Sequence, residues 1–579
     1  MLQVYRSWAL DARAKQNTGY WQGFSFDKVT HFSPYLMFGE PSAMQAVAYP
    51  FYPPLLQKDN KSPPSIPSAV PFDAGVGVID EATFRTIEVG KLFESIDHTR
   101  TRTGQAVLYR SLARPLANLA SIVAKQGALA EIEADPVLRD GLENLLGKAK
   151  KREGEFYDLL YASFLGAIGS PAHPLEIVGF GYDSYINGTR FMLDLCADAT
   201  ALPSPKSSYL TALLDVLRGF AQSRAHALMQ GPVYRSEKDI LTKAEKRWYT
   251  PAVKFHPSMF KPGIFIGGAL LVGLALKFLP LVLQMSVPIS PVLWLFLLPL
   301  GLIYIPVVGG FDRDACIYPL REIFKRSPEV QAALDALGCM DELLSFIGYR
   351  EAFGHPTVLA EMTDSTRHRL DLKSVRNPIL AKGNPDYVAN DLCLDEERLA
   401  LVTGPNSGGK TAFCKTLAQT QLLAQIGCYV PALQAKLAVA DHIYYQTPEI
   451  SHLADGEGRF GTELKRTKEV FMASTARSLV IMDELSEGTT HEEKIEISTD
   501  ILNGFRQKGA STLLITHNHE LVDHFQGQNI GLARQVEFKD EMPTYRLVEG
   551  ISRVSHADRV AKKIGFAKED IARMLKGKA

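Results

Sequence analysis

The hydrophobic positions of the chain follow three patterns, and each pattern predicts a different kind of structure. Between residues 79 and 248, and again after residue 311, leucines recur at the spacing of amphipathic helices, about 3.6 residues per turn. The residues on these faces are Leu138, Leu142, Leu145, Leu146, Leu210, Leu213, Leu214, Leu217, Leu334, Leu337, Leu344 and Ile347. We therefore expect a mostly α-helical domain in two halves, residues 76–259 and residues 311–370.

Two long apolar runs separate these halves. They are Ile264–Leu283, in which Lys277 is the single charged residue, and Val287–Val308. A helix that crosses a bilayer needs about 20 apolar residues, so each run is long enough. Basic residues flank the pair and the turn between the runs is uncharged, which places both flanks in the cytoplasm. The pattern predicts a two-helix transmembrane hairpin at residues 260–310, within the membrane over residues 264–308.

Other structures could accommodate the same two runs. One alternative is a hairpin buried in a large soluble core. The other is a re-entrant pair at a membrane surface, which the prolines of the segment favour: Pro280, Pro288, Pro291, Pro299 and Pro306.

Short apolar runs mark the last third of the chain. Leu399–Thr403, Ser478–Met482 and Thr512–Thr516 read as buried strands, and Thr411–Ile426 reads as a helix. These elements predict an α/β domain at residues 371–579. Residues 1–75 are rich first in aromatic residues and then in proline, which indicates an amino-terminal extension and linker.

Composition limits the partners and the compartment. A chain of 579 residues suggests about three or four domains. The formal net charge is −1, so the chain as a whole has no attraction to nucleic acid, although a local basic face could. The six cysteines are scattered without a C-x-x-C pair, which disfavours disulfides and zinc sites and fits a reducing compartment.

The chemistry begins at the turn between the first predicted strand and the helix. Gly404 to Thr411 fits G-x-x-x-x-G-K-[ST], the phosphate-binding loop, in the strand–loop–helix context that this loop requires. Lys410 can reach the β- and γ-phosphates of ATP, and the hydroxyl of Thr411 can hold Mg²⁺. The predicted nucleotide-binding residues are Gly404, Pro405, Asn406, Ser407, Gly408, Gly409, Lys410, Thr411 and Ala412.

Three further side chains follow the other predicted strands. Asp483 and Glu484 come after Ser478–Met482, and His517 follows Thr512–Thr516. Asp483 is suited to hold Mg²⁺ and Glu484 to polarise the water that attacks ATP. His517 could sense the γ-phosphate. We therefore predict an ATPase with Lys410, Glu484 and His517 as catalytic residues and with Thr411 and Asp483 as metal ligands.

These motifs resemble those of the MutS family of DNA mismatch-repair ATPases. TGPNSGGKT resembles the family's TGPNMGGKS, LVIMDELSEGTT at 479–490 resembles LVLMDEIGRGTS, and ITH at 515–517 resembles its A-T-H. In the helical region, Ile79-Asp80…Thr83…Ile87-Glu88 resembles the start of the family's lever domain, and Leu92-Phe93…Thr99-Arg100-Thr101…Gly104 resembles its L-F…T-R-T…G pattern. The resemblance implies a MutS/ABC-like ATPase domain, a helical lever, adenine stacking on Tyr387 and a homodimer formed through the ATPase domains.

The sequence also departs from the family pattern. The apolar pair stands where the family inserts its DNA clamp, and there is no room before Ile79 for both the mismatch-reading and connector domains. The stretch 458–463 lacks the serine that acts across the family's dimer. We therefore expect a membrane-anchored variant, multi-pass in a bacterial inner membrane, with its ATPase and lever domains in the cytoplasm.

Two functions are consistent with this reading. The first is an ATPase that switches a dimer of levers and binds DNA, as the resemblance implies. The alternative is a membrane-associated remodelling or signalling ATPase without a nucleic-acid substrate, which the missing domains and neutral net charge favour. A transporter ATPase fits least, because two spans are few and an LSGGQ-type stretch is absent from the sequence.

Overall fold

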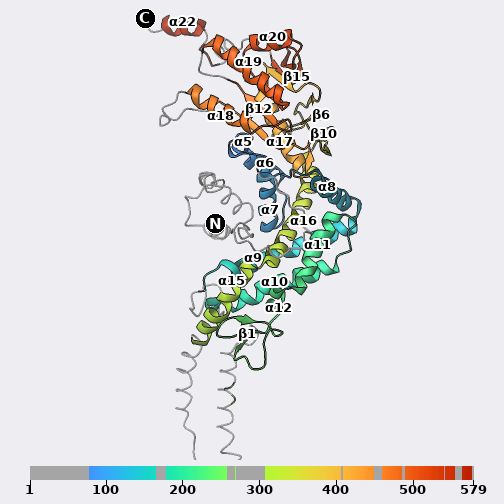
Figure 1. Cartoon of the computed structure of the whole chain (residues 1–579), viewed down its shortest axis with the longest axis vertical. Coiled ribbons are helices and arrows are strands. Elements are labelled where there is room, and N and C mark those ends of the chain that lie inside the picture. The colour runs from blue at the N-terminus through green and yellow to red at the C-terminus, as the bar shows by residue number, and fades with distance from the viewer. Residues whose placement is uncertain are drawn as a thin grey trace, which may run out of the picture. The chain divides into compact units, whose positions relative to one another are not determined.

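The structure of the chain is a computed structural model (Figure 1) that describes residues 77–164, 178–256, 268, 271, 307–405, 408–448, 459–485, 490–539, 542–553, 564–566 and 568–576. The described residues form two compact units. Unit 1 takes its residues from Thr99–Val107 and from within Glu131–Glu342, and unit 2 takes them from within 71–98, Leu108–Ala130 and 343–579.

The transmembrane prediction is corrected by the structure. In the part of the chain that the structure describes, no helix is both long and apolar enough to cross a membrane. Most of residues 264–308 lies outside the described residues. The prediction relied on the length and hydropathy of each run, and neither property requires one unbroken helix; the prolines in both runs remove backbone donors that such a helix needs. The predicted inner-membrane location and the membrane partner depended on this hairpin and are withdrawn with it.

Unit 1 is built mainly from helices. Its principal elements are α9 (Pro136–Tyr161), α10 (Tyr182–Ala201), α11 (Ser208–Gly219), α12 (Arg224–Gln230) and α15 (Tyr318–Arg326), with a small sheet of order β2–β1–β3 (Ile240–Leu241, Val233–Arg235, Val253–Phe255). The leucine faces predicted in α9 and α11 are confirmed as buried. Helices α9 and α10 approach closely at Gly188, where a Cβ would lie 2.8 Å from the Cβ of Leu159.

Three helices, α7 (Arg102–Ala113), α8 (Leu119–Ala134) and α16 (Pro328–Phe353), each contribute residues to both units. Two buried carboxylates cap the amino terminus of α7. Asp341 accepts hydrogen bonds from the backbone N–H groups of Arg100 and Thr101, and Glu153 accepts one from Arg102. Burial raises the pKa of both carboxyls. A Cβ on Gly104 would lie 2.1 Å from Oδ2 of Asp341, so the glycine of the TRTG stretch leaves room for this cap.

Unit 2 contains the predicted α/β domain. Its central sheet has the order β11–β12–β13–β8–β14–β15, with β15 antiparallel to β14 and the other neighbours parallel. The strands are β11 (Ile443–Gln446), β12 (Leu479–Asp483), β13 (Ser511–Ile515), β8 (Leu399–Thr403), β14 (Leu532–Lys539) and β15 (Met542–Glu549). β8, β12 and β13 confirm the three strands predicted from the apolar runs. Their side chains are buried on both faces, as is typical of a parallel sheet covered by helices.

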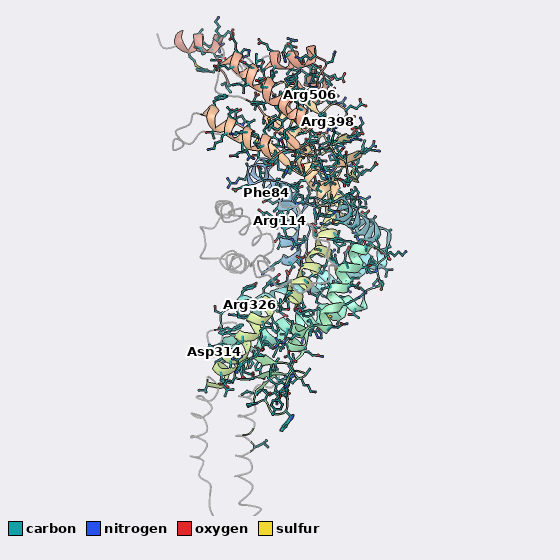
Figure 2. All side chains as sticks on the ribbon, viewed as in Figure 1. Phe84, Arg114, Asp314, Arg326, Arg398 and Arg506 are labelled. Carbon is teal, nitrogen blue, oxygen red and sulfur yellow. The ribbon has the colours of Figure 1, made fainter. Side chains whose placement is uncertain are left out.

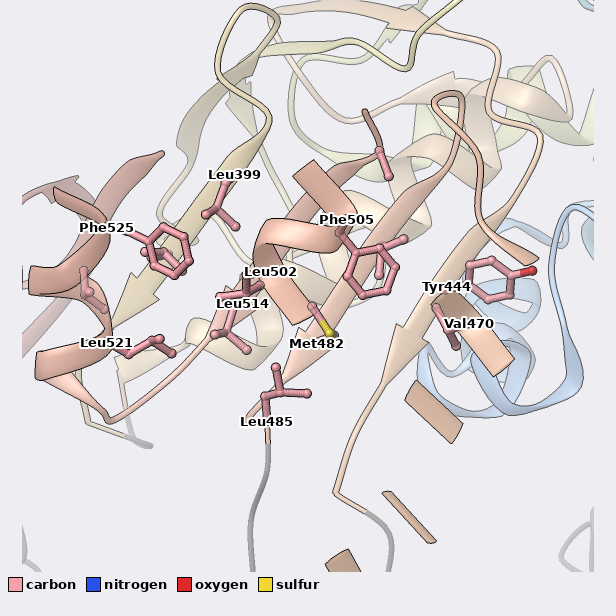
Figure 3. Close-up of a cluster of buried hydrophobic side chains, with 14 of the residues drawn as sticks. Leu399, Tyr444, Val470, Met482, Leu485, Leu502, Phe505, Leu514, Leu521 and Phe525 are labelled. Carbon is pink, nitrogen blue, oxygen red and sulfur yellow. The ribbon is translucent and has the colours of Figure 1, made fainter. Parts of the chain in front are cut away.

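Helices cover the two faces of this sheet. Figure 3 shows the cluster on one face, where Met482 of β12 and Leu514 of β13 lie near Leu502 and Phe505 of α19 (His491–Lys508). Residues of α18 (Arg459–Ala473) and α20 (His519–Gly527) complete this cluster. Helix α17 (Lys410–Gln425) contributes nothing to it but contacts β11, β12 and β13, so it packs against the opposite face.

The remaining elements of unit 2 flank the sheet domain. A second sheet has the order β5–β10–β6–β7 (Glu361–Thr363, Gln434–Ala438, Leu370–Val375, Asn390–Leu394), and β4 (Val358–Leu359) pairs with β9 (Tyr429–Val430). Helices α5 (Glu81–Thr86) and α6 (Val89–Ile96) belong to this unit although they lie some 300 residues earlier in the chain. The hydroxyl of Thr83 in α5 accepts a hydrogen bond from the N–H of Tyr445 in β11. Helix α22 (Lys568–Lys576) ends the described chain.

A fully buried histidine lies before β6. His368 is 0% exposed, and its Nε2 lies 3.3 Å from Oε1 of Gln421. Its backbone carbonyl accepts hydrogen bonds from Arg398, labelled in Figure 2, and from Ser511. Burial lowers the pKa of His368 to about 4.

This pKa makes the stability of the protein depend on pH. The folded-state pKa lies below the ordinary value of 6.5, so stability is complete above pH 6.5 and is lost as pH falls towards 4. Protonation of His368 should lower the free energy of unfolding by about 3 kcal/mol. Urea unfolding, followed by circular dichroism, should show that His368→Gln protein loses correspondingly less free energy of unfolding than wild type between pH 7 and pH 4.5. The control His524→Gln removes an exposed histidine and should keep the wild-type loss; equal losses in all three proteins would contradict the assignment.

Candidate nucleotide site

The strand register brings the predicted catalytic segments to one edge of the central sheet. Val402 of β8 pairs with Ile515 of β13, and Ile515 pairs with Asp483 of β12. The three strands are parallel, so the residues that follow them meet at the same edge. The phosphate-binding loop, Glu484 and His517 are therefore neighbours in space, although His517 follows the loop by more than 100 residues in the sequence.

The loop is shaped by glycines in places where side chains would not fit. Gly404 has φ +132° and Gly409 has φ +84°, conformations that L side chains rarely adopt. A Cβ on Gly408 would lie 2.9 Å from Cγ2 of Val536 in β14, and one on Gly404 would lie 3.1 Å from the same methyl. Strand β14 thus forms a wall behind the loop. The predicted residues Asn406 and Ser407 lie outside the described residues.

Lys410 begins α17 and lies under the loop. Its side chain is 1% exposed, and Nζ donates a hydrogen bond of 2.5 Å to the carbonyl of Gly404. Burial lowers the pKa of its ammonium group, while Glu484 and Asp483 oppose this shift. The helix is capped by Gly409, which has no side chain to occupy the N–H groups of the first turn, where Thr411 and Ala412 lie. This end of α17 therefore presents positive potential to the loop.

Thr411 and Asp483 form the pair predicted to hold a metal. The hydroxyl of Thr411 donates to Oδ2 of Asp483 over 2.9 Å. Burial raises the pKa of Asp483, opposed by this hydrogen bond and by Lys410 and Lys415. Among the described residues, no group of three or more His, Cys, Asp or Glu could hold a metal alone. One carboxylate and one hydroxyl fit Mg²⁺, which prefers oxygen and takes its other ligands from water and phosphates.

Glu484 is held in a strained backbone conformation. Its φ is +65°, and its N–H donates to the carbonyl of Ile515 in β13 over 2.9 Å. The side chain is 14% exposed; its Oε1 lies 3.6 Å from Nε2 of His517 and its Oε2 lies 3.7 Å from Nζ of Lys494. Strained residues of this kind concentrate at functional sites. The structure thus brings Glu484 and His517 together and adds Lys494.

Tyr387 lies against α17. Its hydroxyl interacts with the Thr416 side chain and with the backbone of Asn377, and burial raises its pKa. The side-chain amide of Asn377 donates to Thr416 and to Gln419. The tyrosine is therefore anchored to the helix that carries the phosphate-binding loop.

Sequence reasoning missed two residues beside the site. Lys494 lies in the first turn of α19, four residues after the family-like motif ends, and the only signal was the capping pattern Thr490-x-x-Glu493, which places a helix start there. Tyr545 of β15 lies next to the loop, with Cδ1 3.3 Å from where a Cβ of Gly409 would be, and its φ is +60°. Nothing in its local sequence connects it with the loop, because the contact is made by the β14–β15 hairpin.

Comparisons with known proteins agree with this geometry. The family model "MutS domain V" matches residues 400–576. The part of the chain that carries the site belongs to the MutS family. The DNA mismatch repair protein MutS of Thermotoga petrophila is 32% identical over 254 residues, which cover 42% of this chain and 32% of that protein.

Other MutS-family relatives match to the same extent. The DNA mismatch repair protein MSH3 of Phaeosphaeria nodorum is 32% identical over 256 residues, which cover 42% of this chain and 22% of that protein. The endonuclease MutS2 of Thermus thermophilus is 32% identical over 257 residues, which cover 44% of this chain and 33% of that protein. The matches span a third or less of the length of these relatives.

The contact between the loop and β14 can be tested by a paired substitution. Gly408→Ala would place its Cβ 2.9 Å from Val536, so the loop should shift and nucleotide affinity should fall by about tenfold, the effect of about 1.4 kcal/mol. Val536→Ala removes the opposing methyl groups and should restore much of the affinity in the double variant. Titration with a fluorescent ATP analogue measures both effects. A double variant no better than Gly408→Ala would show that Val536 does not limit the loop.

Proposed function

We propose that the chain binds ATP with Mg²⁺ and hydrolyses it at this site, and that it does so as a MutS-type ATPase acting on DNA. The observation that carries the proposal is the convergence of Lys410, the Thr411–Asp483 pair and Glu484 at one sheet edge. Each has the side chain and the position that phosphoryl transfer requires.

Binding would change the partner of Lys410. Its ammonium group, which donates to the Gly404 carbonyl, would turn to the β- and γ-phosphates, whose charge compensates for its burial. The N–H groups of the loop and of the first turn of α17 would bind the remaining phosphate oxygens. Thr411 and Asp483 would hold Mg²⁺, which neutralises phosphate charge during transfer.

Hydrolysis requires an oriented water molecule. Glu484 would accept a hydrogen bond from this water, whose oxygen bonds to the γ-phosphorus as the bond to the bridging oxygen of ADP breaks. The water's proton passes through Glu484 to the phosphate released. His517, 3.6 Å from Oε1 of Glu484, would respond to the γ-phosphate. Tyr387 is proposed to contact adenine.

DNA as the substrate rests on the relatives. Two of the proteins quoted above are named as DNA mismatch repair proteins and the third as an endonuclease. We also propose a homodimer formed through the ATPase domains. ATP binding would then bias the dimer between two states, because the γ-phosphate would contact both the loop and the Glu484 edge of the sheet.

Two substitutions test the ATPase assignment. Lys410→Ala should weaken ATP binding, because the phosphates lose their buried cation. Glu484→Gln should keep ATP binding and lower the hydrolysis rate by about 100-fold or more, the range for removing a general base. Both are measured by phosphate release and equilibrium nucleotide binding with purified full-length protein. Wild-type turnover in either variant would refute its assigned role.

Binding to nucleic acid is tested separately. The purified chain should bind homoduplex, mismatched or branched DNA with an affinity that falls at least about tenfold when salt is raised fourfold, because phosphate contacts release counterions. ATP should change this affinity in wild type but not in Lys410→Ala protein, which is the matched control. Absence of binding at low salt, from protein that still hydrolyses ATP, would refute DNA as the substrate and leave the ATPase intact.

A further inference from the structure

Lys494, which lies outside the predicted motifs, reaches Glu484 at the sheet edge where the predicted catalytic residues meet, here called the catalytic edge. Its Nζ lies 3.7 Å from Oε2 of Glu484, and the two side chains are 16% and 14% exposed. At this exposure the interaction is less screened than a surface ion pair.

The position of Lys494 is set by the start of α19. Thr490 and Glu493 form a capping box, and the N–H of Lys494 donates to the carbonyl of Thr490 over 2.9 Å. Further along the same helix, Leu502 and Phe505 are buried in the cluster of Figure 3. Lys494 therefore projects from a helix whose beginning and packed face are both held in place.

Glu484 faces charged or titratable groups from each neighbouring element. Lys494 on α19 lies near one carboxylate oxygen and His517, after β13, lies near the other. Lys410 on α17 interacts electrostatically with Glu484, and Asp483 precedes it in the chain. Lys410 is expected to turn to the phosphates when ATP binds, which leaves Lys494 as the cation that stays with the carboxylate.

We propose that Lys494 is a positioning residue that holds the Glu484 carboxylate in the correct orientation for the attacking water. This inference rests on the proposed ATPase function. A free glutamate side chain samples several rotamers, and only some of them can accept a hydrogen bond from water in line with the γ-phosphate. The cation at Oε2 and the imidazole at Oε1 together restrict the carboxylate to one orientation.

Removal of the cation should affect turnover more than binding. In Lys494→Met protein, kcat should fall by about tenfold or more, as for other losses of catalytic orientation, while KM and the Kd for ATP change by less than about threefold. Lys494→Arg keeps the charge and should restore most of kcat, and Lys494→Gln provides a second neutral variant if the methionine protein is unstable. Lys468→Met changes an exposed lysine of α18 and should behave as wild type. Wild-type kcat in a folded Lys494→Met or Lys494→Gln protein would overturn the proposal.

A double-mutant cycle separates this inference from the function on which it rests. In the Glu484→Gln background, Lys494→Met should cause no further loss of the single-turnover rate, because the carboxylate that it positions is gone. An equal loss in both backgrounds would show that Lys494 acts independently of Glu484 and would overturn the proposal. Full activity of Glu484→Gln itself would refute the ATPase assignment. An inactive Glu484→Gln protein beside a fully active Lys494→Met protein would refute the positioning role alone.

Discussion

The burial of α17 from Thr416 to Gln425 is the constraint on which unit 2 depends. The helix begins at the phosphate-binding loop, and its residues from Thr416 to Gln425 are all buried, three glutamines among them. A buried amide without a partner costs roughly 1–3 kcal/mol, so each glutamine requires a specific acceptor nearby. Gln419 donates to the carbonyl of Ile87, Gln421 to that of Ala438, and Gln425 to those of Leu116 and Ala440.

These hydrogen bonds connect the nucleotide site with distant parts of the chain. Ile87 caps α5, Leu116 lies between α7 and α8, and Ala438 ends β10. A shift of α17 on nucleotide binding would therefore have to move those segments or break buried hydrogen bonds. Within unit 2, this gives a physical route by which the state of the loop can affect residues far from it in sequence.

Burial also affects the charged residues at the catalytic edge of the central sheet. Lys410, Asp483 and Glu484 are all largely removed from water, and the pKa values of Lys410 and Asp483 are shifted towards their neutral forms. The attraction between Lys410 and the two carboxylates, and the hydrogen bond from the Thr411 hydroxyl to Asp483, partly compensate for the free-energy cost of burying these charges. In the proposed function, a ligand would bring both negative phosphate oxygens for Lys410 and a divalent cation for Asp483, and so compensate for the burial of both groups.

The sequence by itself determined the elements and the local motifs of this protein. The apolar runs of β8, β12 and β13, the leucine faces of α9 and α11 and the phosphate-binding loop depend on periodicity and on glycine conformation, which are local properties. The transmembrane hairpin predicted at residues 260–310 rested on hydropathy, which measures how apolar a segment is; in the part of the chain that the structure describes, no helix is long and apolar enough to cross a membrane.

Only the tertiary structure decided which distant residues share the site. Lys494 reaches Glu484, Tyr545 lies against Gly409, and α5 joins a domain some 300 residues away because of sheet order, helix starts and buried hydrogen bonds. These contacts join segments that are distant in the chain, and the local sequence of one segment does not indicate which other segment it contacts.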